Sequence, residues 1–302
     1  MAACRGFFGG SGSALMARPE AVQEVLKLCG RAPEATTVCY VGTATYDLPQ
    51  FRQVQTGGFA DVGCKVTDLK VAVESPTAAE IAATVSSADI VVVSGGNTLF
   101  ATDRWNKLGV SGVLRKAWHD GSCVMAGGSA GAIWVFDGGH SDSADPHYFK
   151  RAMLSPTWDT DRADTAWDYI RVPALGLIPG LLCPHHDRIQ SNGTPRCLDF
   201  DQMMLRHPGE RGVAIDHWAA LVTDGGDYRV FTVAGDSGSL LDDGSVTQDG
   251  KGAPAIWTKE VVEGQIVTTL APAAGKLDDL VRPATEIVQD ARCHDIRKAN
   301  PE

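Results

Sequence analysis

The sequence predicts an α/β protein in which helices cover both faces of a mostly parallel sheet. Strand-like and helix-like segments alternate through the first half of the chain. One of the strand-like segments, residues 90–94, is a β-branched run bounded by turn residues, which is typical of a central strand. The later strand-like segments are shorter and are joined by Gly/Asp turns. Alternation of this kind is typical of a doubly wound sheet with an antiparallel extension.

The individual elements of the first half follow from local signals. We expect strands at residues 36–43, within 61–72, at 90–94 and at 123–126, and helices at 19–30, 77–85 and 112–120. Pro19 suits a first helical turn and Gly30 suits a stop. Thr77 and Glu80 have the spacing of a capping box. These signals place a glycine turn after two of the strands, at Gly95 and Gly127.

The second half is predicted to extend the same sheet. Residues 212–223, 228–233 and 256–270 are expected to be strands of an antiparallel edge. Residues 143–171 are rich in Asp, Thr and Trp and show little periodicity, so they are expected to form a lid or a surface loop. We expect one domain over 1–302, with residues 1–17 and 290–302 peripheral.

Composition excludes several classes of partner. The chain of 302 residues has a formal net charge of -10, so no basic field attracts nucleic acid or an anionic membrane. No run approaches the about 18 apolar residues of a membrane span, and the N-terminal apolar stretch is too weak for a signal peptide. The eight cysteines are scattered and form no CxxC motif, as expected of reduced thiols. We therefore expect a cytoplasmic protein.

The strongest chemical signal is the motif G-x-S-x-G at residues 127–131, where Ser129 follows a strand and precedes a helix. This context is what a nucleophile elbow requires. The backbone N–H of Ala130 would lie at a helix start, where it could stabilise an oxyanion. The alternative is a glycine-rich structural turn that happens to contain a serine.

A serine nucleophile needs a base, because its hydroxyl is weakly nucleophilic at neutral pH. Of the eight histidines, the pair in the run C-P-H-H-D at residues 183–187 stands out, since it follows an apolar segment. His140 and His147 remain open alternatives, whereas His217 lies in a strand-like run and is expected to be packed or at the surface. A metal site at 183–187 is disfavoured because no second ligand cluster has matching spacing, so no metal or cofactor is expected.

The sequence leaves open which residues orient the base and which donate to the oxyanion. The carboxylate that orients the base could be Asp137, Asp142 or Asp145, all of which follow the elbow at short range. The N–H of Gly96, in the second glycine turn, could be another oxyanion donor. That turn could equally bind phosphate, although it lacks the P-loop lysine and the dinucleotide spacing.

Taken together, four motifs resemble the dipeptidase E (aspartyl dipeptidase) family and its cyanophycinase relatives. They are S-G-G-N-T at 94–98, G-G-S-A-G-A at 127–132, H-S-D-S at 140–143 and C-P-H-H-D at 183–187. The similarity runs from about residue 36 to residue 233. It implies a fold like the class I glutamine amidotransferases, with serine in place of their cysteine.

The resemblance also implies roles for individual residues. These are Ser129 as nucleophile, His185 as base, Asp142 as the aspartate after the elbow, Gly96 and Ala130 as oxyanion-hole positions, and Asn97 facing the substrate. The activity implied is removal of an N-terminal Asp from short peptides, which needs a cationic group that the sequence does not identify. A small peptide is the expected partner, and a homodimer is an option. The chain departs from the family at Ser94, where a third glycine is usual.

Three alternatives stay open on sequence grounds. An α/β-hydrolase esterase would share the elbow, but its HGGG-type turn is absent and only His294 lies near the C-terminus. A non-catalytic binding module would keep the pocket without acylation of Ser129. A cyanophycinase-like peptidase would need acidic residues to hold arginine.

Overall fold

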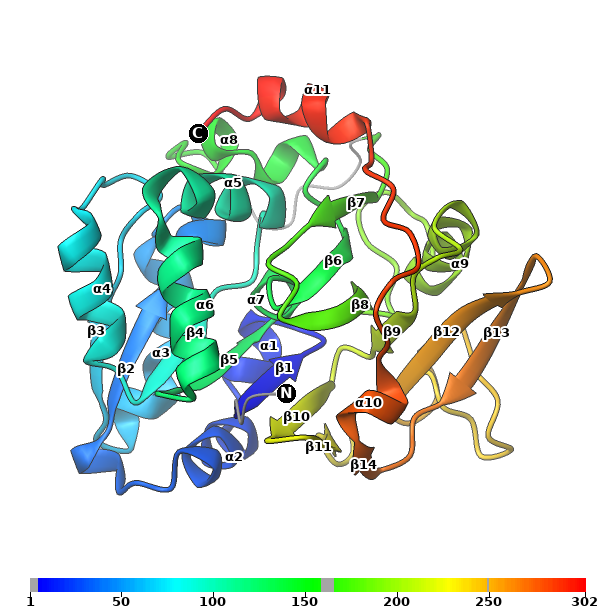
Figure 1. Ribbon diagram of the computed structural model, residues 1–302, viewed down its shortest axis with the longest axis horizontal. Coiled ribbons are helices and arrows are strands. Elements are labelled where there is room, and N and C mark those ends of the chain that lie inside the picture. Colours follow the sequence, from blue (N-terminus) through cyan, green and yellow to red (C-terminus); the bar gives the residue numbers. More distant parts are fainter. Residues whose placement is uncertain (1–4, 159–165, 249) are drawn as a thin grey trace.

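The computed structural model describes residues 5–158, 166–248 and 250–302, which form two sheets and the helices around them (Figure 1). The strands are β1 Gly6–Gly9, β2 Thr37–Val41, β3 Lys65–Asp68, β4 Ile90–Val93, β5 Val124–Gly128, β6 Phe136–Ser141, β7 Ile170–Pro173, β8 Ile178–Cys183, β9 Gly212–Ile215, β10 Ala219–Asp224, β11 Asp227–Thr232, β12 Ile256–Val262, β13 Gln265–Leu270 and β14 Ala274–Lys276. The helices are α1 Ser13–Met16, α2 Pro19–Cys29, α3 Pro49–Asp61, α4 Ala78–Ser86, α5 Thr98–Leu108, α6 Val110–Asp120, α7 Ala130–Ile133, α8 Lys150–Met153, α9 Arg196–Arg206, α10 Leu277–Leu280 and α11 Arg292–Ala299. Short 3-10 turns lie at Pro33–Ala35, Thr43–Thr45 and Pro146–Tyr148.

The larger sheet has the strand order β14-β11-β10-β1-β5-β4-β2-β3. Its five strands from β1 to β3 are parallel to their neighbours, and β10, β11 and β14 extend it in antiparallel fashion. The predicted α/β fold with a mostly parallel sheet and an antiparallel extension is therefore confirmed.

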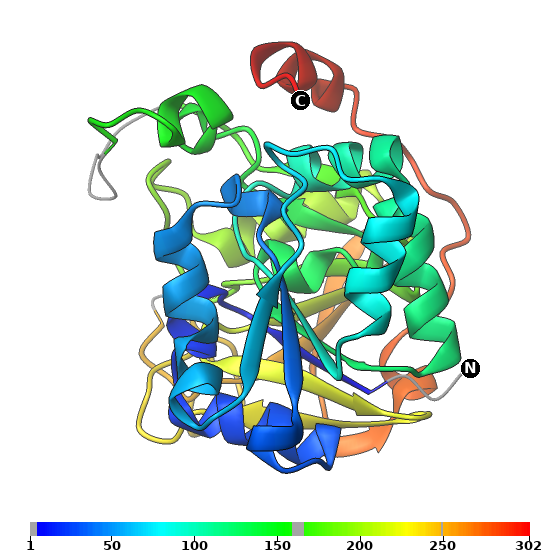
Figure 2. The same ribbon diagram turned by 90° about the vertical axis from the view of Figure 1, so that its left-hand side faces the viewer.

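Both faces of this sheet are covered because successive strand residues point to opposite sides. In β4, Val91 and Val93 pack in a core with α4, α5 and α6, whereas Ile90 and Val92 pack in a second core with α1, α2 and α3. Figure 2, viewed from the β2–β3 side of the sheet, shows helices on either side of the strands. A fully apolar four-residue strand is what burial on two faces requires.

Local signals fixed several element ends as predicted. Helix α2 begins at Pro19 and ends at Cys29, and it is capped by Gly30, whose φ of 71° is a left-handed conformation that glycine adopts readily. Thr77 and Glu80 form the capping box at the start of α4. Helix α6 begins at Val110, two residues before the predicted start.

A second, six-stranded sheet with the order β13-β12-β9-β8-β6-β7 was not predicted. The expectation of one strand over 212–223 was wrong, because the chain leaves this sheet after β9 and joins the larger sheet as β10. Residues 256–270 also belong to the second sheet, as the hairpin β12–β13, and not to the edge of the first. Strands β10 and β11 do form the predicted antiparallel edge.

The expectation that residues 1–17 are peripheral was wrong, whereas residues 290–302 are mostly exposed. Strand β1 lies between β10 and β5 and is fully buried. Near the C-terminus, α11 packs on α5, where Arg297 forms two hydrogen bonds with Asp103 at 2.7 and 2.9 Å. Asn300 is buried and accepts a hydrogen bond from the backbone N–H of Lys150. The single-domain organisation stays a prediction.

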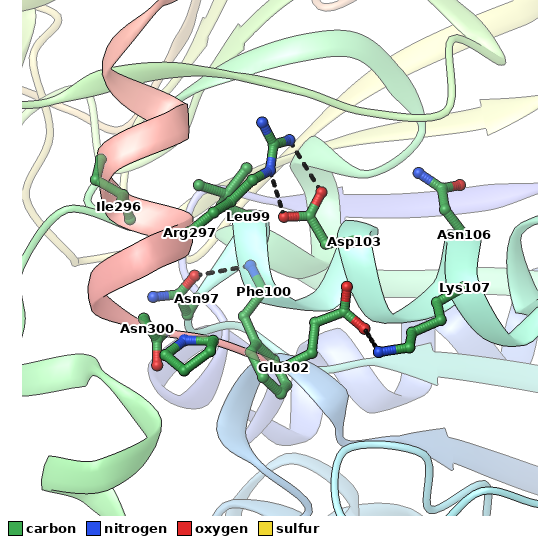
Figure 3. A pocket seen from close by; sticks show the side chains of 11 residues that line it. Asn97, Leu99, Phe100, Asp103, Asn106, Lys107, Ile296, Arg297, Asn300 and Glu302 are labelled. Atoms are coloured by element: carbon green, nitrogen blue, oxygen red, sulfur yellow. Dashed lines mark hydrogen bonds and ion pairs between the residues drawn. The ribbon is translucent and has the colours of Figure 1, made fainter.

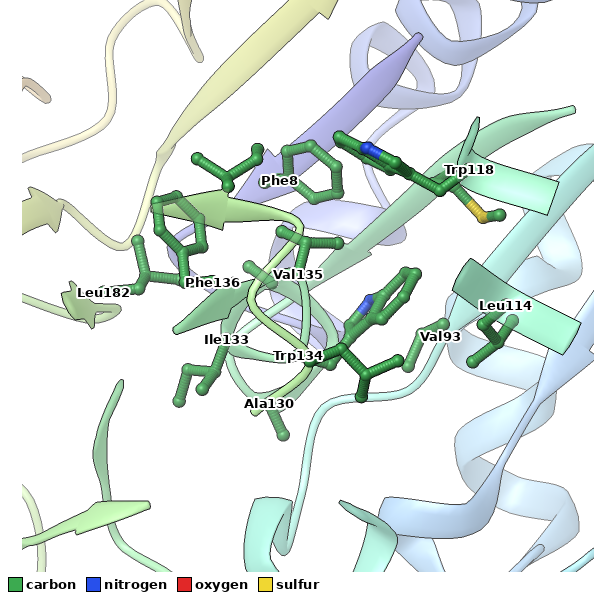
Figure 4. Packing of buried hydrophobic residues seen from close by; sticks show 14 of the residues in the cluster. Phe8, Val93, Leu114, Trp118, Ala130, Ile133, Trp134, Val135, Phe136 and Leu182 are labelled. Atoms are coloured by element: carbon green, nitrogen blue, oxygen red, sulfur yellow. The ribbon is translucent and has the colours of Figure 1, made fainter. Parts of the chain in front are cut away.

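One apolar core joins the two sheets. The segment from α7 into β6 is buried throughout, and its side chains pack against Phe8 and Val93 of the larger sheet and Leu182 of the smaller one (Figure 4). Trp134 is the largest side chain of this segment and contacts Trp105 edge-on, with ring centroids 6.2 Å apart. Because α7 begins directly after Ser129, this core fixes the position of the elbow.

The seven cysteines that the structure describes are all buried and free, whereas Cys4 lies outside the described residues. Of the predicted lid, residues 159–165 also lie outside them; the remainder contains a 3-10 turn, α8 and the start of β7. No helix within the described ranges is long and apolar enough to span a membrane. The cytoplasmic location stays a prediction.

A buried ion pair gives a stability prediction. The guanidinium of Arg171, in β7, donates to both carboxylate oxygens of Glu210 at 2.7 Å, and both side chains are fully buried. Replacing Glu210 with Ala leaves an unpaired buried charge, so we expect a loss of about 3–5 kcal/mol in the free energy of unfolding. Urea denaturation measures it. The control is Lys116→Ala, which removes the exposed pair with Asp120 and should change stability by less than about 1 kcal/mol; equal losses in the two variants would contradict the assignment.

Candidate active site

The carboxyl ends of parallel strands from both sheets meet around one cavity of about 300 Å³. Loops at this edge of parallel sheets commonly form ligand sites. The residues that follow the strands and line the cavity are Ser11, Gly12, Ser13 and Ala14 after β1, Thr45 after β2, Gly95, Gly96 and Asn97 after β4, Ser129 after β5, Asp142 after β6, His185 after β8 and His217 after β9. The structure thus brings all but one of the predicted site residues to the same cavity, and the exception, Ala130, follows Ser129 directly.

Ser129 sits at a sharp turn between β5 and α7. Its φ of 57° and ψ of -121° lie in a region that residues other than glycine seldom adopt. Its backbone N–H donates to the carbonyl of Gly9 at 3.0 Å, which ties the turn to β1. Ser129 as a whole residue is 8% exposed, and it lines the cavity. This is the geometry of a nucleophile elbow.

Two glycines allow the turn to pack this closely. A Cβ at Gly128 would lie 1.9 Å from the carbonyl oxygen of Ser11, and one at Gly131 would lie 2.1 Å from that of Val93. Neither approach leaves room for a side chain, so backbone contact requires glycine at both positions.

Two backbone N–H groups are available beside Ser129. Those of Gly96 and Ala130 donate no hydrogen bond to another described residue. The N–H of Ala130 is at the start of α7, where unsatisfied donors favour negative charge. Gly96 has a φ of 118° and lines the cavity. Both positions match those expected of an oxyanion hole, a role that stays a prediction.

His185 pairs with another histidine and not with a carboxylate. Its Nδ1 lies 2.9 Å from the Nδ1 of His217, and both rings line the cavity. In a pair of this kind, one ring donates its N–H and the other accepts. The expectation that His217 is only a packed or surface residue was therefore wrong, because its ring contacts the candidate base inside the cavity.

Both rings are held in the neutral form. Burial, followed by the neighbouring His217, Arg196 and Arg188, lowers the pKa of His185 well below 6.5. Burial and Arg188 lower the pKa of His217 to about 4. At neutral pH, His185 is therefore unprotonated and able to accept a proton, as a general base must be.

Asp142 does not orient His185. Its Oδ2 accepts a hydrogen bond from Nε2 of Gln190 at 3.0 Å and lies 3.6 Å from the guanidinium of Arg196. No hydrogen bond joins Asp142 to His185 among the described residues. Asp142 does line the cavity, so the resemblance placed it at the site, but His217 occupies the position next to the base that we had expected Asp142 to take.

The other candidate residues have structural contacts. Asn97 caps α5, since its Oδ1 accepts from the N–H of Phe100 and its Nδ2 donates to the carbonyl of Ser143. His140 is fully buried against Asp199, and His147 stacks on Trp158. The Nδ1 of His186 lies 3.3 Å from Oδ1 of Asp216, and His186 is not among the described residues that line the cavity. Among the described residues, no group of three or more His, Cys, Asp or Glu side chains is arranged to hold a metal ion.

A larger cavity, of about 460 Å³, lies between α5 and the C-terminal segment. Its charged side chains already pair with one another, as Figure 3 shows for Arg297 with Asp103 and Lys107 with Glu302. Ser, Thr, Cys and His are absent from its described lining residues. We therefore place the chemistry in the smaller cavity; Asn97 lines both.

A serine at a strained strand-to-helix turn, beside a neutral histidine and two free N–H groups, is the arrangement that serine hydrolases use for acyl transfer. The comparisons agree with this class. Residues 8–231 match the model of peptidase family S51, and the chain therefore belongs to that family. The predicted resemblance to dipeptidase E is confirmed, and the chain is a member of a peptidase family.

Two individual relatives each share 29% sequence identity with the chain. The chain is 29% identical over 314 residues to a Trypanosoma brucei brucei protein named G2/mitotic-specific cyclin-1, covering 95% of this chain and 90% of that one. It is also 29% identical over 154 residues to the uncharacterized peptidase YgaJ of Bacillus subtilis, covering 51% of this chain and 56% of the relative. The fold is similar to that of a putative peptidase E from Listeria monocytogenes, with a TM-score of 0.53, 18% identity, and coverage of 77% of this chain and all of that one.

The lowered pKa of His217 predicts an acid-sensitive fold. Between about pH 6.5 and pH 4 the unfolded chain binds a proton at His217 that the folded chain does not, so stability rises with pH in this window and is lost as the pH falls. When the pH falls from 7.5 to 4.5, we expect the free energy of unfolding of His217→Gln to decrease by about 1–2 kcal/mol less than that of the wild type. Urea denaturation at the two pH values measures the difference, and equal losses would show that His217 does not titrate abnormally.

Proposed function

We propose that the protein is a serine peptidase that hydrolyses short peptides through an acyl-enzyme on Ser129. The observation that carries the proposal is the placement of Ser129, at a strained elbow, in the same cavity as the His185–His217 pair and beside two unpaired N–H groups. Membership of a peptidase family supports the same reaction class.

The proposed reaction has two steps. His185 takes the proton of Ser129 as its Oγ attacks the scissile carbonyl, and the N–H groups of Gly96 and Ala130 donate to the oxyanion. His185 then protonates the leaving amine, and a water activated by His185 hydrolyses the ester. No hydrogen bond joins Ser129 and His185 among the described residues; such bonds often tighten only when substrate is bound.

His217 takes the orienting role in this mechanism. For Nε2 of His185 to act as base, His185 must carry its proton on Nδ1, and Nδ1 of His217 must accept it. His217 thus selects the tautomer, as the aspartate of a Ser-His-Asp triad does. Unlike a carboxylate, a neutral imidazole adds no negative charge to stabilise the imidazolium.

The cavity limits the substrate. About 300 Å³ is at the small end of ligand cavities, which favours dipeptides and other short peptides. The preference for an N-terminal Asp that the resemblance implies would need a cation beside the substrate carboxylate. Lys and Arg are absent from the described residues that line the cavity. Cleavage of Asp-Xaa therefore stays a hypothesis that depends on the family resemblance alone.

The nucleophile is tested directly by covalent labelling. We expect a fluorophosphonate to modify the wild type at Ser129, identified by peptide mass spectrometry, and to leave Ser129→Ala unlabelled. In the same samples, hydrolysis of Asp-Leu, Leu-Leu and β-Asp-Arg should fall about 10⁴- to 10⁶-fold in the variant for whichever peptide the wild type cleaves.

The control for this experiment is Ser122→Ala, which changes a serine after α6 that does not line the cavity. It should be labelled and active like the wild type. Absence of labelling and of hydrolysis in the wild type would favour a non-catalytic binding module, and labelling without peptide cleavage would favour an esterase.

The pH profile tests the role of His217. In the wild type, the acid limb of kcat/KM should lie below pH 6.5, since the pKa of His185 is lowered. His217→Ala should lower kcat at least about 10²-fold by freeing the tautomer. His217→Glu should restore activity and move the acid limb to higher pH, because a carboxylate beside His185 favours its protonated form.

Fluorophosphonate labelling and peptide hydrolysis over pH 5–9 supply both readouts. Retention of the wild-type profile in both His217 variants, together with a shifted profile in Asp142→Asn, would return the orienting role to Asp142.

A further inference from the structure

One acidic side chain lines the cavity in the described part of the chain, and its position bears on which substrates fit. Of the described lining residues, Asp142 is the only Asp or Glu, Lys and Arg are absent, and His185 and His217 are neutral at pH 7. A cation on the substrate would therefore meet an acceptor among the lining side chains, whereas a carboxylate would meet no lining cation; the guanidinium of Arg196, 3.6 Å from Asp142, is not part of the lining.

Asp142 is held in place from its buried side. Gln190 donates to its Oδ2, and Arg196 forms an ion pair with the same oxygen. Arg196 is fully buried and does not line the cavity, and it also donates to Oε1 of Gln190 at 2.6 Å and to the carbonyl of His140 at 2.6 Å. These contacts fix the carboxylate. Its other oxygen, Oδ1, has no hydrogen bond within the described part of the chain and remains available as an acceptor.

Three other side chains that line the cavity are aromatic or apolar. Phe51, Tyr148 and Met153 line the same cavity. Phe51 packs against Trp158 at 6.0 Å between ring centroids, and Met153 is buried in a small apolar cluster with Tyr46 and Phe100. An apolar side chain buried against this wall gains free energy by leaving water, and a charged one loses it.

We infer that Asp142 is the binding site for the free α-ammonium of the substrate, and that Phe51, Tyr148 and Met153 receive an apolar first side chain. This rests on the proposed peptidase function and specifies its substrate class: short peptides with an unblocked amino terminus and an uncharged first residue. A charge-assisted hydrogen bond from the ammonium to Oδ1 would hold the scissile carbonyl at a fixed distance from the anchored end. The enzyme is then an aminopeptidase that removes one residue at a time and disfavours N-terminal Asp.

The test compares four p-nitroanilides: Leu, N-acetyl-Leu, Asp and N-acetyl-Lys. The wild type should cleave the Leu compound best, and Asp142→Asn should lower its kcat/KM about 10- to 100-fold. The variant should cleave N-acetyl-Leu p-nitroanilide as slowly as the wild type does, because that substrate lacks the ammonium. Asp120→Asn, the same chemical change at an exposed site, is the control and should match the wild type.

Each other outcome has a distinct meaning. Preference for N-acetyl-Lys p-nitroanilide would show that Asp142 binds a side-chain ammonium and would overturn the α-ammonium assignment, as would equal cleavage of the acetylated and free Leu compounds. Preference for the Asp compound would overturn the apolar subsite. An equal loss on every substrate in Asp142→Asn, with slower fluorophosphonate labelling, would make Asp142 part of the acyl-transfer machinery.

The labelling rate separates this inference from the proposed function. Ser129 should react with a fluorophosphonate equally fast in the wild type and in Asp142→Asn, because that reagent has no ammonium. Unreactive Ser129 in the wild type would defeat the proposed function itself, whereas normal labelling with the wrong substrate preference would defeat only the subsite.

Discussion

The site depends on a close backbone contact that only glycine permits. Gly128 lies against the carbonyl of Ser11 and Gly131 against that of Val93, so β1, β4 and β5 converge on the turn that carries Ser129. The apolar segment that follows, from Ala130 to Phe136, is buried between both sheets and prevents the turn from relaxing. The unfavourable φ of Ser129 is therefore maintained by packing energy from the core, as strained functional residues require.

The second sheet positions the acidic residue and both histidines that line the cavity in the described part of the chain. Strands β6, β8 and β9 run parallel to one another, and their carboxyl ends bring Asp142, His185 and His217 to the cavity. Ser129, in contrast, follows a strand of the larger sheet. The buried Arg171–Glu210 pair joins β7 of this sheet to the loop before β9. The distance between Ser129 and His185 is thus set by how the two sheets pack, which the shared apolar core determines.

Sequence patterns located the elbow at Ser129 because its signal is local. A strand, a glycine turn and a helix start occur within about ten residues of Ser129, and each has its own sequence signature. Strand β1 has no such signature: it is four residues long, begins and ends with glycine, and becomes central only because Phe7 and Phe8 pack in different cores.

The prediction that His217 is only packed or at the surface was wrong for a related reason. Residues 212–223 form a nearly continuous apolar run, and the break that exposes His217 lies at Asp216. The carboxylate of Asp216 accepts hydrogen bonds from the backbone N–H groups of Ser239 and Ala255, which are distant in sequence. Tertiary contacts therefore created the turn, and the same argument explains why spacing alone could not decide between Asp142 and His217 as the partner of His185.

The charge distribution around the histidines gives the proposed mechanism its particular character. Among the described residues, no carboxylate hydrogen-bonds to the ring of His185 or His217. The carboxylate of Asp187 accepts instead from the backbone N–H of His217 at 2.7 Å. When His185 takes a proton from Ser129, the new positive charge must be balanced by the oxyanion that forms in the same step. Because both charges arise together inside a partly buried cavity, their mutual attraction is strong. A larger share of transition-state stabilisation then falls on the N–H groups of Gly96 and Ala130 than in a site whose base is paired with an aspartate.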